Sequence, residues 1–201
     1  VAREAVGRRS VLVQGESGSG RCTVARALHY GGDRSGPFLP IDCRAIARDA
    51  MESELFGYVK DAFPGATSDR PGLFQCAHLG TVCLESFEAL PLELQAKVHR
   101  AVTRGEVIRI GGKRVENVDV RLIAITSVDF DKAKEGGTFD EGLVEELSHV
   151  ELLVPPLRER PEDVPLLASE MVQRFSPGED RLTPTDDVLW VLSQYDWPEN
   201  I

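Results

Sequence analysis

The sequence predicts an α/β fold built on a parallel sheet. Five short runs rich in apolar and β-branched residues alternate with segments of helical periodicity. Each run is apolar on both faces or nearly so, as a strand covered by helices on both sides must be. The five predicted strands are Val11–Gln14, Phe38–Cys43, Gly80–Leu84, Val120–Thr126 and Val150–Val154.

Helices and a hairpin are predicted between these strands. One helix covers Thr23–Tyr30 and is ended by a Gly-Gly pair, and another covers Leu92–Arg104, between a proline and a glycine. The segment Val107–Val115 differs, because two short β-rich runs flank a second Gly-Gly pair. This pattern is typical of a β-hairpin with a glycine turn.

The strand pattern ends at the proline pair 155–156. Beyond it, helical periodicity covers Glu162–Phe175 and Asp186–Tyr195. We therefore expect a sheet subdomain over residues 1–156 and a helical subdomain over residues 157–201, truncated at its C-terminus. The chain lacks an initiating Met and stops just after a turn signal, so we expect a fragment of a longer protein.

Charge, hydrophobicity and cysteine content exclude several classes of protein. The formal net charge of −10 argues against general nucleic-acid binding, which depends on Lys and Arg, so DNA contact is expected only through domains outside this chain. No stretch approaches the roughly 20 apolar residues that a membrane-spanning helix needs. The four cysteines form no CxxC pair and show no metal-ligand spacing. A reducing, cytoplasmic location without membrane contact is therefore expected.

A glycine-rich segment follows the first predicted strand and precedes a helix. In such a phosphate loop, backbone N–H groups and the helix N-terminus face the phosphates of a nucleotide. Similar strand-to-helix turns also occur without a ligand, so the segment alone leaves nucleotide binding undecided. The candidate nucleotide-binding residues are Gly15, Glu16, Ser17, Gly18, Ser19, Gly20, Arg21 and Cys22.

Further motifs follow in a fixed order along almost the whole chain. They read ELFGYVKDAFPGA at 54–66, GTVCLES at 80–86, PPLRERPEDVPLL at 155–167 and YDWP at 195–198. In this order and spacing they resemble the AAA+ ATPase domain of bacterial sigma-54-dependent transcriptional activators. The resemblance implies a P-loop AAA+ three-layer αβα sandwich with a parallel sheet, followed by the start of a small helical lid subdomain.

The resemblance also implies ligands and partners. ATP or ADP with Mg²⁺ is the expected cofactor, and sigma-54 RNA polymerase holoenzyme and further copies of the chain are the expected partners. The loop that contacts sigma-54 in this family corresponds to Phe63, Pro64, Gly65 and Ala66, with Pro64 in place of the family's Thr. A large apolar side chain such as Phe63, on a loop that cannot easily bury it, indicates a contact surface.

The residues that depart from the family pattern are those of the hydrolytic chemistry. Arg21 replaces the phosphate-loop Lys, and Glu85-Ser86 replaces the Asp-Glu pair of the Walker B strand. Glu85 keeps a carboxylate that can hold Mg²⁺ through water, whereas Ser86 cannot polarise the attacking water. General-base groups contribute roughly 10²–10⁴-fold to rate.

Three more positions of the catalytic machinery differ. Ser127 replaces the Asn of sensor I, and Asp140 and Glu146 replace the arginine fingers that this family offers to the neighbouring subunit. An arginine finger is worth roughly 10³–10⁵ in rate, and a carboxylate facing a phosphate is repulsive. The substitutions together predict impaired hydrolysis.

Three hypotheses follow from these residues. The leading one is a degenerate domain of a transcriptional regulator that acts by nucleotide binding, assembly or partner contact. The second is a working ATPase that remodels sigma-54 RNA polymerase, with Glu85, Glu88 or Asp129 substituting for the lost carboxylate. The third is an interaction module independent of sigma-54.

Overall fold

The computed structural model describes residues 9–130, 132, 136–176 and 182–201. The chain forms two compact units. The first contains residues 9–14 and 21–153, and the second contains residues 15–20 and 154–201. The glycine-rich loop therefore groups with the C-terminal segment, a partition that sequence patterns did not indicate.

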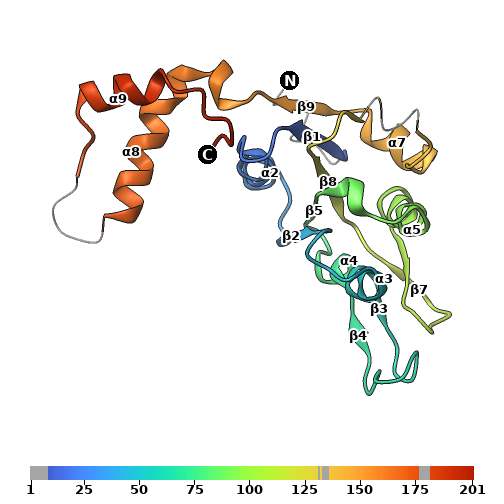
Figure 1. Ribbon diagram of the computed structural model, residues 1–201. Coiled ribbons are helices and arrows are strands. Elements are labelled where there is room, and N and C mark those ends of the chain that lie inside the picture. Colours follow the sequence, from blue (N-terminus) through green and yellow to red (C-terminus); the bar gives the residue numbers. More distant parts are fainter. Residues whose placement is uncertain (1–8, 131, 133–135, 177–181) are drawn as a thin grey trace. The chain divides into compact units, whose positions relative to one another are not determined.

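The five predicted strands form one sheet (Figure 1). Its order is β2 (Phe38–Asp42), β5 (Thr81–Glu85), β8 (Arg121–Thr126), β1 (Val11–Gly15) and β9 (Glu151–Val154). The pairs β2–β5, β5–β8 and β8–β1 are parallel. The predicted fold class is confirmed, and the observed strand bounds differ from the predicted ones by one residue in most cases.

Helices cover both faces of this sheet (Figure 1). On one face, Leu84 and Leu122 pack into a core with side chains from α3 (Arg48–Phe56), α5 (Leu92–Thr103) and α7 (Glu141–Leu147). Side chains alternate along a strand, so Cys83 and Ile123 are buried on the other face. There α2 (Arg21–Tyr30) contacts β5 and β8.

The predicted hairpin forms, although with a longer connection. Strands β6 (Glu106–Ile108) and β7 (Val115–Asn117) pair antiparallel, with Ile108 opposite Val115. Residues 109–114 connect them, because Ile110 exchanges backbone hydrogen bonds with residues 57 and 59 instead of extending the hairpin. Sequence patterns also missed the helices α3 and α7, the short pair β3 (Gly57–Tyr58) and β4 (Arg70–Pro71), and α4 (Leu73–Cys76).

The second unit contains the two predicted C-terminal helices. Helix α8 covers Val164–Phe175 and α9 covers Asp186–Ser193, and they pack against each other. Two 3₁₀ turns, Leu157–Glu159 and Pro161–Asp163, lead into α8. No helix in the described ranges is long and apolar enough to cross a membrane.

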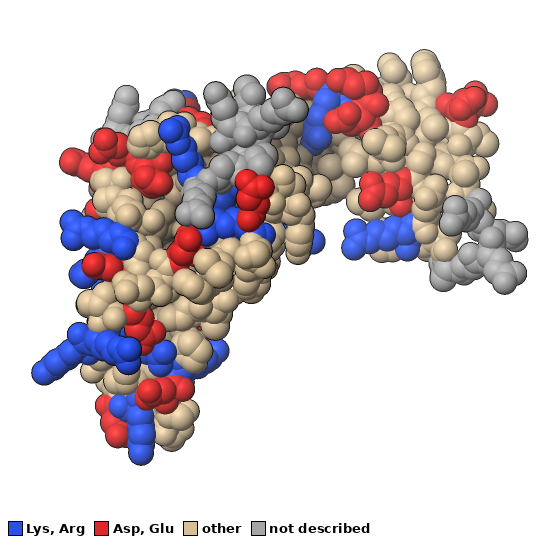
Figure 2. Space-filling view, turned by 180° about the vertical axis from the view of Figure 1, so that it is seen from behind, with Lys and Arg blue, Asp and Glu red and all other residues tan. Residues whose placement is uncertain are grey.

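Charged side chains of both signs are mixed over the surface. On the face seen in Figure 2, Lys and Arg are interspersed with Asp and Glu and do not gather into one basic patch.

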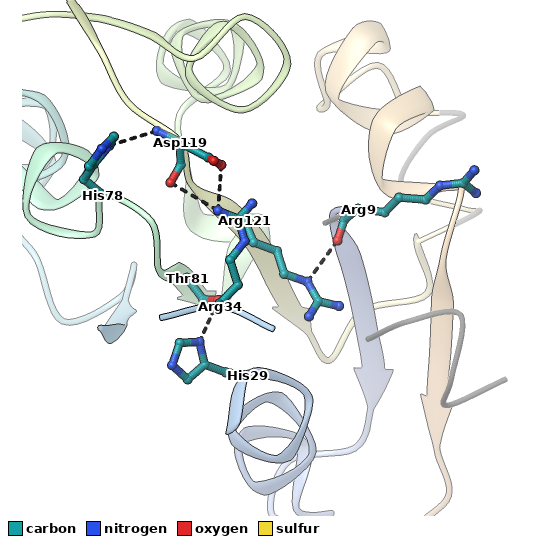
Figure 3. Close-up of polar contacts among 7 residues, drawn as sticks. All are labelled: Arg9, His29, Arg34, His78, Thr81, Asp119 and Arg121. Atoms are coloured by element: carbon teal, nitrogen blue, oxygen red, sulfur yellow. Dashed lines mark hydrogen bonds and ion pairs between the residues drawn. The ribbon is translucent and has the colours of Figure 1, made fainter. Parts of the chain in front are cut away.

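A buried arginine joins β8 to α2 and to the chain before β1. Figure 3 shows its bond to the Arg9 carbonyl. Arg121 is 1% exposed; its Nε donates to the Arg9 carbonyl at 3.0 Å and its Nη1 to the Leu28 carbonyl at 3.2 Å. Leu28 lies in the last turn of α2, where carbonyls lack helical partners and a cation is favourable. Burial, with a smaller contribution from the charge of Arg34, lowers the pKa of Arg121 to about 10, so this side chain stays charged at neutral pH.

Replacing Arg121 should therefore destabilise the fold. Arg121→Met leaves two carbonyls without their donors, and we expect unfolding free energy to fall by about 2–5 kcal/mol. Urea unfolding measures this loss. The matched control is Arg104→Met, an exposed arginine after α5, which should change stability by less than about 0.5 kcal/mol. Equal effects of the two substitutions would contradict this account of Arg121.

Candidate nucleotide-binding site and contact loop

The glycine-rich loop connects β1 to α2. Gly18 and Gly20 have φ values of 74° and 92°, in the left-handed region that favours glycine. The Ser19 N–H donates to the Glu16 carbonyl at 3.2 Å and closes a turn within the loop. The Ser19 side chain is fully buried, and its hydroxyl has no hydrogen-bond partner among the described residues. The local sequence thus gives the turn that the phosphate-loop prediction required.

The same loop is bonded to the C-terminal segment of its unit. Arg158 donates two hydrogen bonds to the Glu16 carboxylate, at 2.5 and 2.8 Å. The Asn200 side-chain amide donates to the same carboxylate and to the Ser17 carbonyl. These bonds span more than 140 residues of sequence, and no motif spacing could have revealed them.

In the first unit, the residues after the loop begin α2. Arg21 and Cys22 are its first two residues, and the Cys22 thiol lies within the influence of the Glu85 carboxylate. Burial, and then the neighbouring Glu85 carboxylate, raise the pKa of Cys22 to about 11. The structure thus brings together Cys22 and Glu85, which the sequence placed in two separate motifs.

The end of β5 holds Glu85 and Ser86, the pair that the sequence resemblance places at the Walker B position. Glu85 is the last residue of the strand, and Ser86 has a left-handed φ of 53°. Among the described residues, no group of three or more His, Cys, Asp or Glu is placed to hold a metal ion. One carboxylate together with nucleotide phosphates and waters is nevertheless an ordinary Mg²⁺ environment, so Glu85 suits the predicted role.

A second carboxylate lies at the same edge of the sheet. Glu88 accepts a hydrogen bond from the Thr126 hydroxyl at 2.8 Å and forms an ion pair with Arg44. Thr126 ends β8 and is fully buried, so it anchors Glu88 to the carboxyl end of the parallel strands. Ligands of open α/β sheets bind at this edge. The sequence named Glu88 as a substitute carboxylate but gave no sign of its partners.

The other three residues that were predicted to replace catalytic ones lie on different elements. Ser127 follows β8 and is exposed. Asp140 is the N-cap of α7, where its carboxylate accepts the Leu143 N–H at 2.9 Å. Glu146 lies within the same helix and is partly exposed. Asp140 therefore stabilises the first turn of α7. Its position in place of a family arginine finger did not suggest this role.

The predicted contact loop is an ordered turn with an exposed aromatic side chain. Phe63 is 40% exposed and packs edge-to-face on Tyr58, with ring centroids 4.9 Å apart. The Ala66 N–H donates to the Phe63 carbonyl at 3.0 Å, around Pro64 and Gly65, both exposed. Ala66 itself is buried, so the exposed part of the loop is residues 63–65.

These features define a AAA+ P-loop domain: a parallel sheet, a glycine loop between β1 and α2, and a following helical unit. A sequence model of the sigma-54 interaction domain matches residues 1–153, and one of the AAA+ ATPase lid domain matches residues 158–201. The chain belongs to the sigma-54 interaction domain family.

Individual relatives agree with this assignment. The regulatory protein AtoC of Escherichia coli is 42% identical over the whole chain, and the transcriptional activator RocR of Bacillus subtilis is 44% identical over 96% of it. The chain spans 44% and 42% of these two proteins. The crystal structure of Brucella abortus NtrX in complex with ATP has a TM-score of 0.84 at 30% identity, covering 99% of this chain and 45% of that one.

Thiol reactivity tests the packing around the phosphate loop and sheet. Burial raises the pKa of Cys22 to about 11 and that of Cys43 to about 12, and it also raises the pKa of Cys83, so all three thiols are protonated at neutral pH. Cys76 is exposed. We expect iodoacetamide at pH 7.5 to label Cys76 first in the native protein, as measured by peptide mass spectrometry. Cys76→Ser should remove this fast phase, and early labelling of Cys22 would argue against its burial beside Glu85.

Proposed function

We propose that this chain is the sigma-54-contacting domain of a bacterial transcriptional regulator, which binds nucleotide but hydrolyses it slowly or not at all. The observation that carries the proposal is Ser86. It stands directly after β5 within an otherwise intact fold, where the family has the water-polarising carboxylate. A serine hydroxyl is not an effective base at neutral pH, so the hydrolytic step loses roughly 10²–10⁴-fold.

Nucleotide binding is supported by the loop and by a relative. The buried Ser19 hydroxyl lacks a partner among the described residues, and such a buried polar group fits a site that receives a polar ligand. NtrX of Brucella abortus has been crystallised with ADP and with ATP. In this chain, Glu85 would hold Mg²⁺, with Arg21 supplying positive charge next to the loop. The metal would neutralise phosphate charge when bound.

Slow hydrolysis is further supported by the finger positions. Asp140 and Glu146 are acidic where a neighbouring subunit in this family would present arginine. Because a carboxylate repels phosphate, self-association that depends on these contacts would be weakened. The domain would then act through its nucleotide-bound state and its partner contacts in the cytoplasm, with DNA bound by other parts of the regulator.

Sigma-54 is proposed as the partner of the Phe63 turn. The aromatic side chain is presented on a turn that its own hydrogen bonds hold, so little ordering is needed on binding. The β6–β7 hairpin supports the turn, because the Val59 N–H donates to the Ile110 carbonyl at 3.1 Å. Pro64 stiffens the turn further, in place of the family's Thr.

One observation favours the second candidate, an active ATPase. Glu88 is a carboxylate with only 15% side-chain exposure, fixed by Thr126 and Arg44 at the carboxyl edge of the sheet. Each carboxylate oxygen can accept two hydrogen bonds, so Glu88 keeps capacity to orient a water molecule. In this candidate, Glu88 would serve in place of the residue lost at Ser86.

Steady-state ATP hydrolysis by the full-length protein separates these two candidates. We expect turnover at the background of the assay and no change with Glu88→Gln. The matched control is Glu93→Gln, an exposed glutamate of α5. Turnover comparable with that of ordinary family members, abolished by Arg21→Ala and lowered at least about 100-fold by Glu88→Gln, would replace our proposal with the second candidate.

Retention of sigma-54 on the immobilised protein tests the partner. Phe63→Ala should weaken this binding at least about tenfold, because a truncated aromatic anchor typically costs more than about 1 kcal/mol. Phe175→Ala, which alters another exposed phenylalanine, is the control and should bind normally. If the unchanged protein does not retain sigma-54, the interaction module independent of sigma-54 becomes the better hypothesis.

A further inference from the structure

Every residue of the phosphate loop from Glu16 to Ser19 is bonded to the C-terminal segment of its own unit. Three backbone carbonyls and one carboxylate accept the hydrogen bonds. The donors are Arg158 for the Glu16 carboxylate, Asn200 Nδ2 for Glu16 and Ser17, the Ile201 N–H for Gly18, and Arg160 Nη2 for Ser19.

The direction of these bonds orients the peptide groups of the loop. In a trans peptide, the carbonyl of one residue points opposite to the N–H of the next. The carbonyls of Ser17 and Ser19 point to the donors Asn200 and Arg160. The N–H groups of Gly18 and Gly20 therefore point away from these donors. Backbone N–H groups that converge on one side of a loop form an anion-binding nest.

Close backbone contact reinforces this orientation. A Cβ atom added to Gly18 would lie 2.2 Å from the Glu199 carbonyl oxygen, so the loop packs against this backbone with no room for a side chain. Asn200 has a buried side chain, and its Oδ1 accepts the Leu157 N–H at 2.7 Å. The Asn200 side chain thus links the loop at Glu16 and Ser17 to the backbone of Leu157.

The charge of Glu16 makes Arg158 important for phosphate binding. A carboxylate within a phosphate loop repels the phosphates of a ligand. The bonds from Arg158, and then from Asn200, lower the pKa of Glu16 to about 2, so its charge is present at neutral pH and is matched by the guanidinium. Removal of Arg158 would leave that negative charge unmatched beside the ligand.

We propose that Arg158, Arg160 and Asn200 form a clasp that sets the conformation and the charge of the phosphate loop, and through the loop the affinity for nucleotide phosphates. They are positioning residues, because they act through the loop. This proposal rests on nucleotide binding as proposed above. The proposal assigns a role to residues 157–160 (LRER) and 197–200 (WPEN) that their sequences did not reveal.

Calorimetric titration of the full-length protein with ATP and ADP tests the charge of the clasp. We expect Arg158→Met to weaken ATP binding about tenfold, with a smaller effect on ADP, which carries less phosphate charge. Glu16→Gln combined with Arg158→Met should restore ATP affinity to within about threefold of Glu16→Gln alone. Arg174→Met, an exposed arginine of α8, is the matched control.

The double variant makes the test specific. If Arg158→Met acted only by disturbing the local structure, it would weaken ATP binding equally in the wild-type protein and in Glu16→Gln. Unchanged affinity in Arg158→Met, or a double variant as weak as the single one, would overturn the charge matching that we propose.

Hydrogen exchange in the nucleotide-free protein tests the clasp separately from the proposed function. Asn200→Ala should speed the exchange of amides in residues 16–20, because it removes bonds to Glu16 and Ser17. Unchanged exchange would overturn the clasp even if nucleotide binds. If wild-type protein binds no nucleotide and Asn200→Ala speeds exchange, the clasp stands and the nucleotide part of the proposed function fails.

Discussion

Strand β8 is buried along its whole length, from Arg121 to Thr126, and much of the first unit depends on this burial. It pairs with β5 on one side and β1 on the other, with helices over both faces. A strand in this position must be apolar or must satisfy every polar group that it buries. The four middle residues of the strand are apolar: Leu122, Ile123, Ala124 and Ile125. The polar residues at its two ends, Arg121 and Thr126, have hydrogen-bond partners.

The two polar ends of β8 have different consequences. At its beginning, Arg121 bonds to carbonyls of the chain before β1 and of α2, which ties the sheet to that helix. At its end, the Thr126 hydroxyl donates to Glu88, which holds a carboxylate at the edge where ligands of such sheets bind. The same burial thus serves stability at one edge of the sheet and positions a candidate functional group at the other.

Local sequence accounted for the five strands of the sheet and for α2, α5, α8 and α9, because each of these elements carries its own periodicity. The five strand runs were apolar on both faces, and this pattern has few solutions other than a parallel sheet between helices. Short elements such as β3 and β4 were missed, because two residues are too few to show a period. The connection of the β6–β7 hairpin was misjudged, because Ile110 is bonded to residues 57 and 59, far away in sequence.

The sequence by itself determined the family and the fold class, because motif order and residue identity are properties of the chain, and it also supplied the prediction that hydrolytic residues are replaced. Only the tertiary structure decided what the acidic side chains of the candidate sites contact. It showed that Asp140 caps a helix, that Glu88 is held by Thr126 and Arg44, and that Glu16 is matched by Arg158. These partners lie up to 142 residues apart in sequence, and the folding of the backbone brings them within bonding distance.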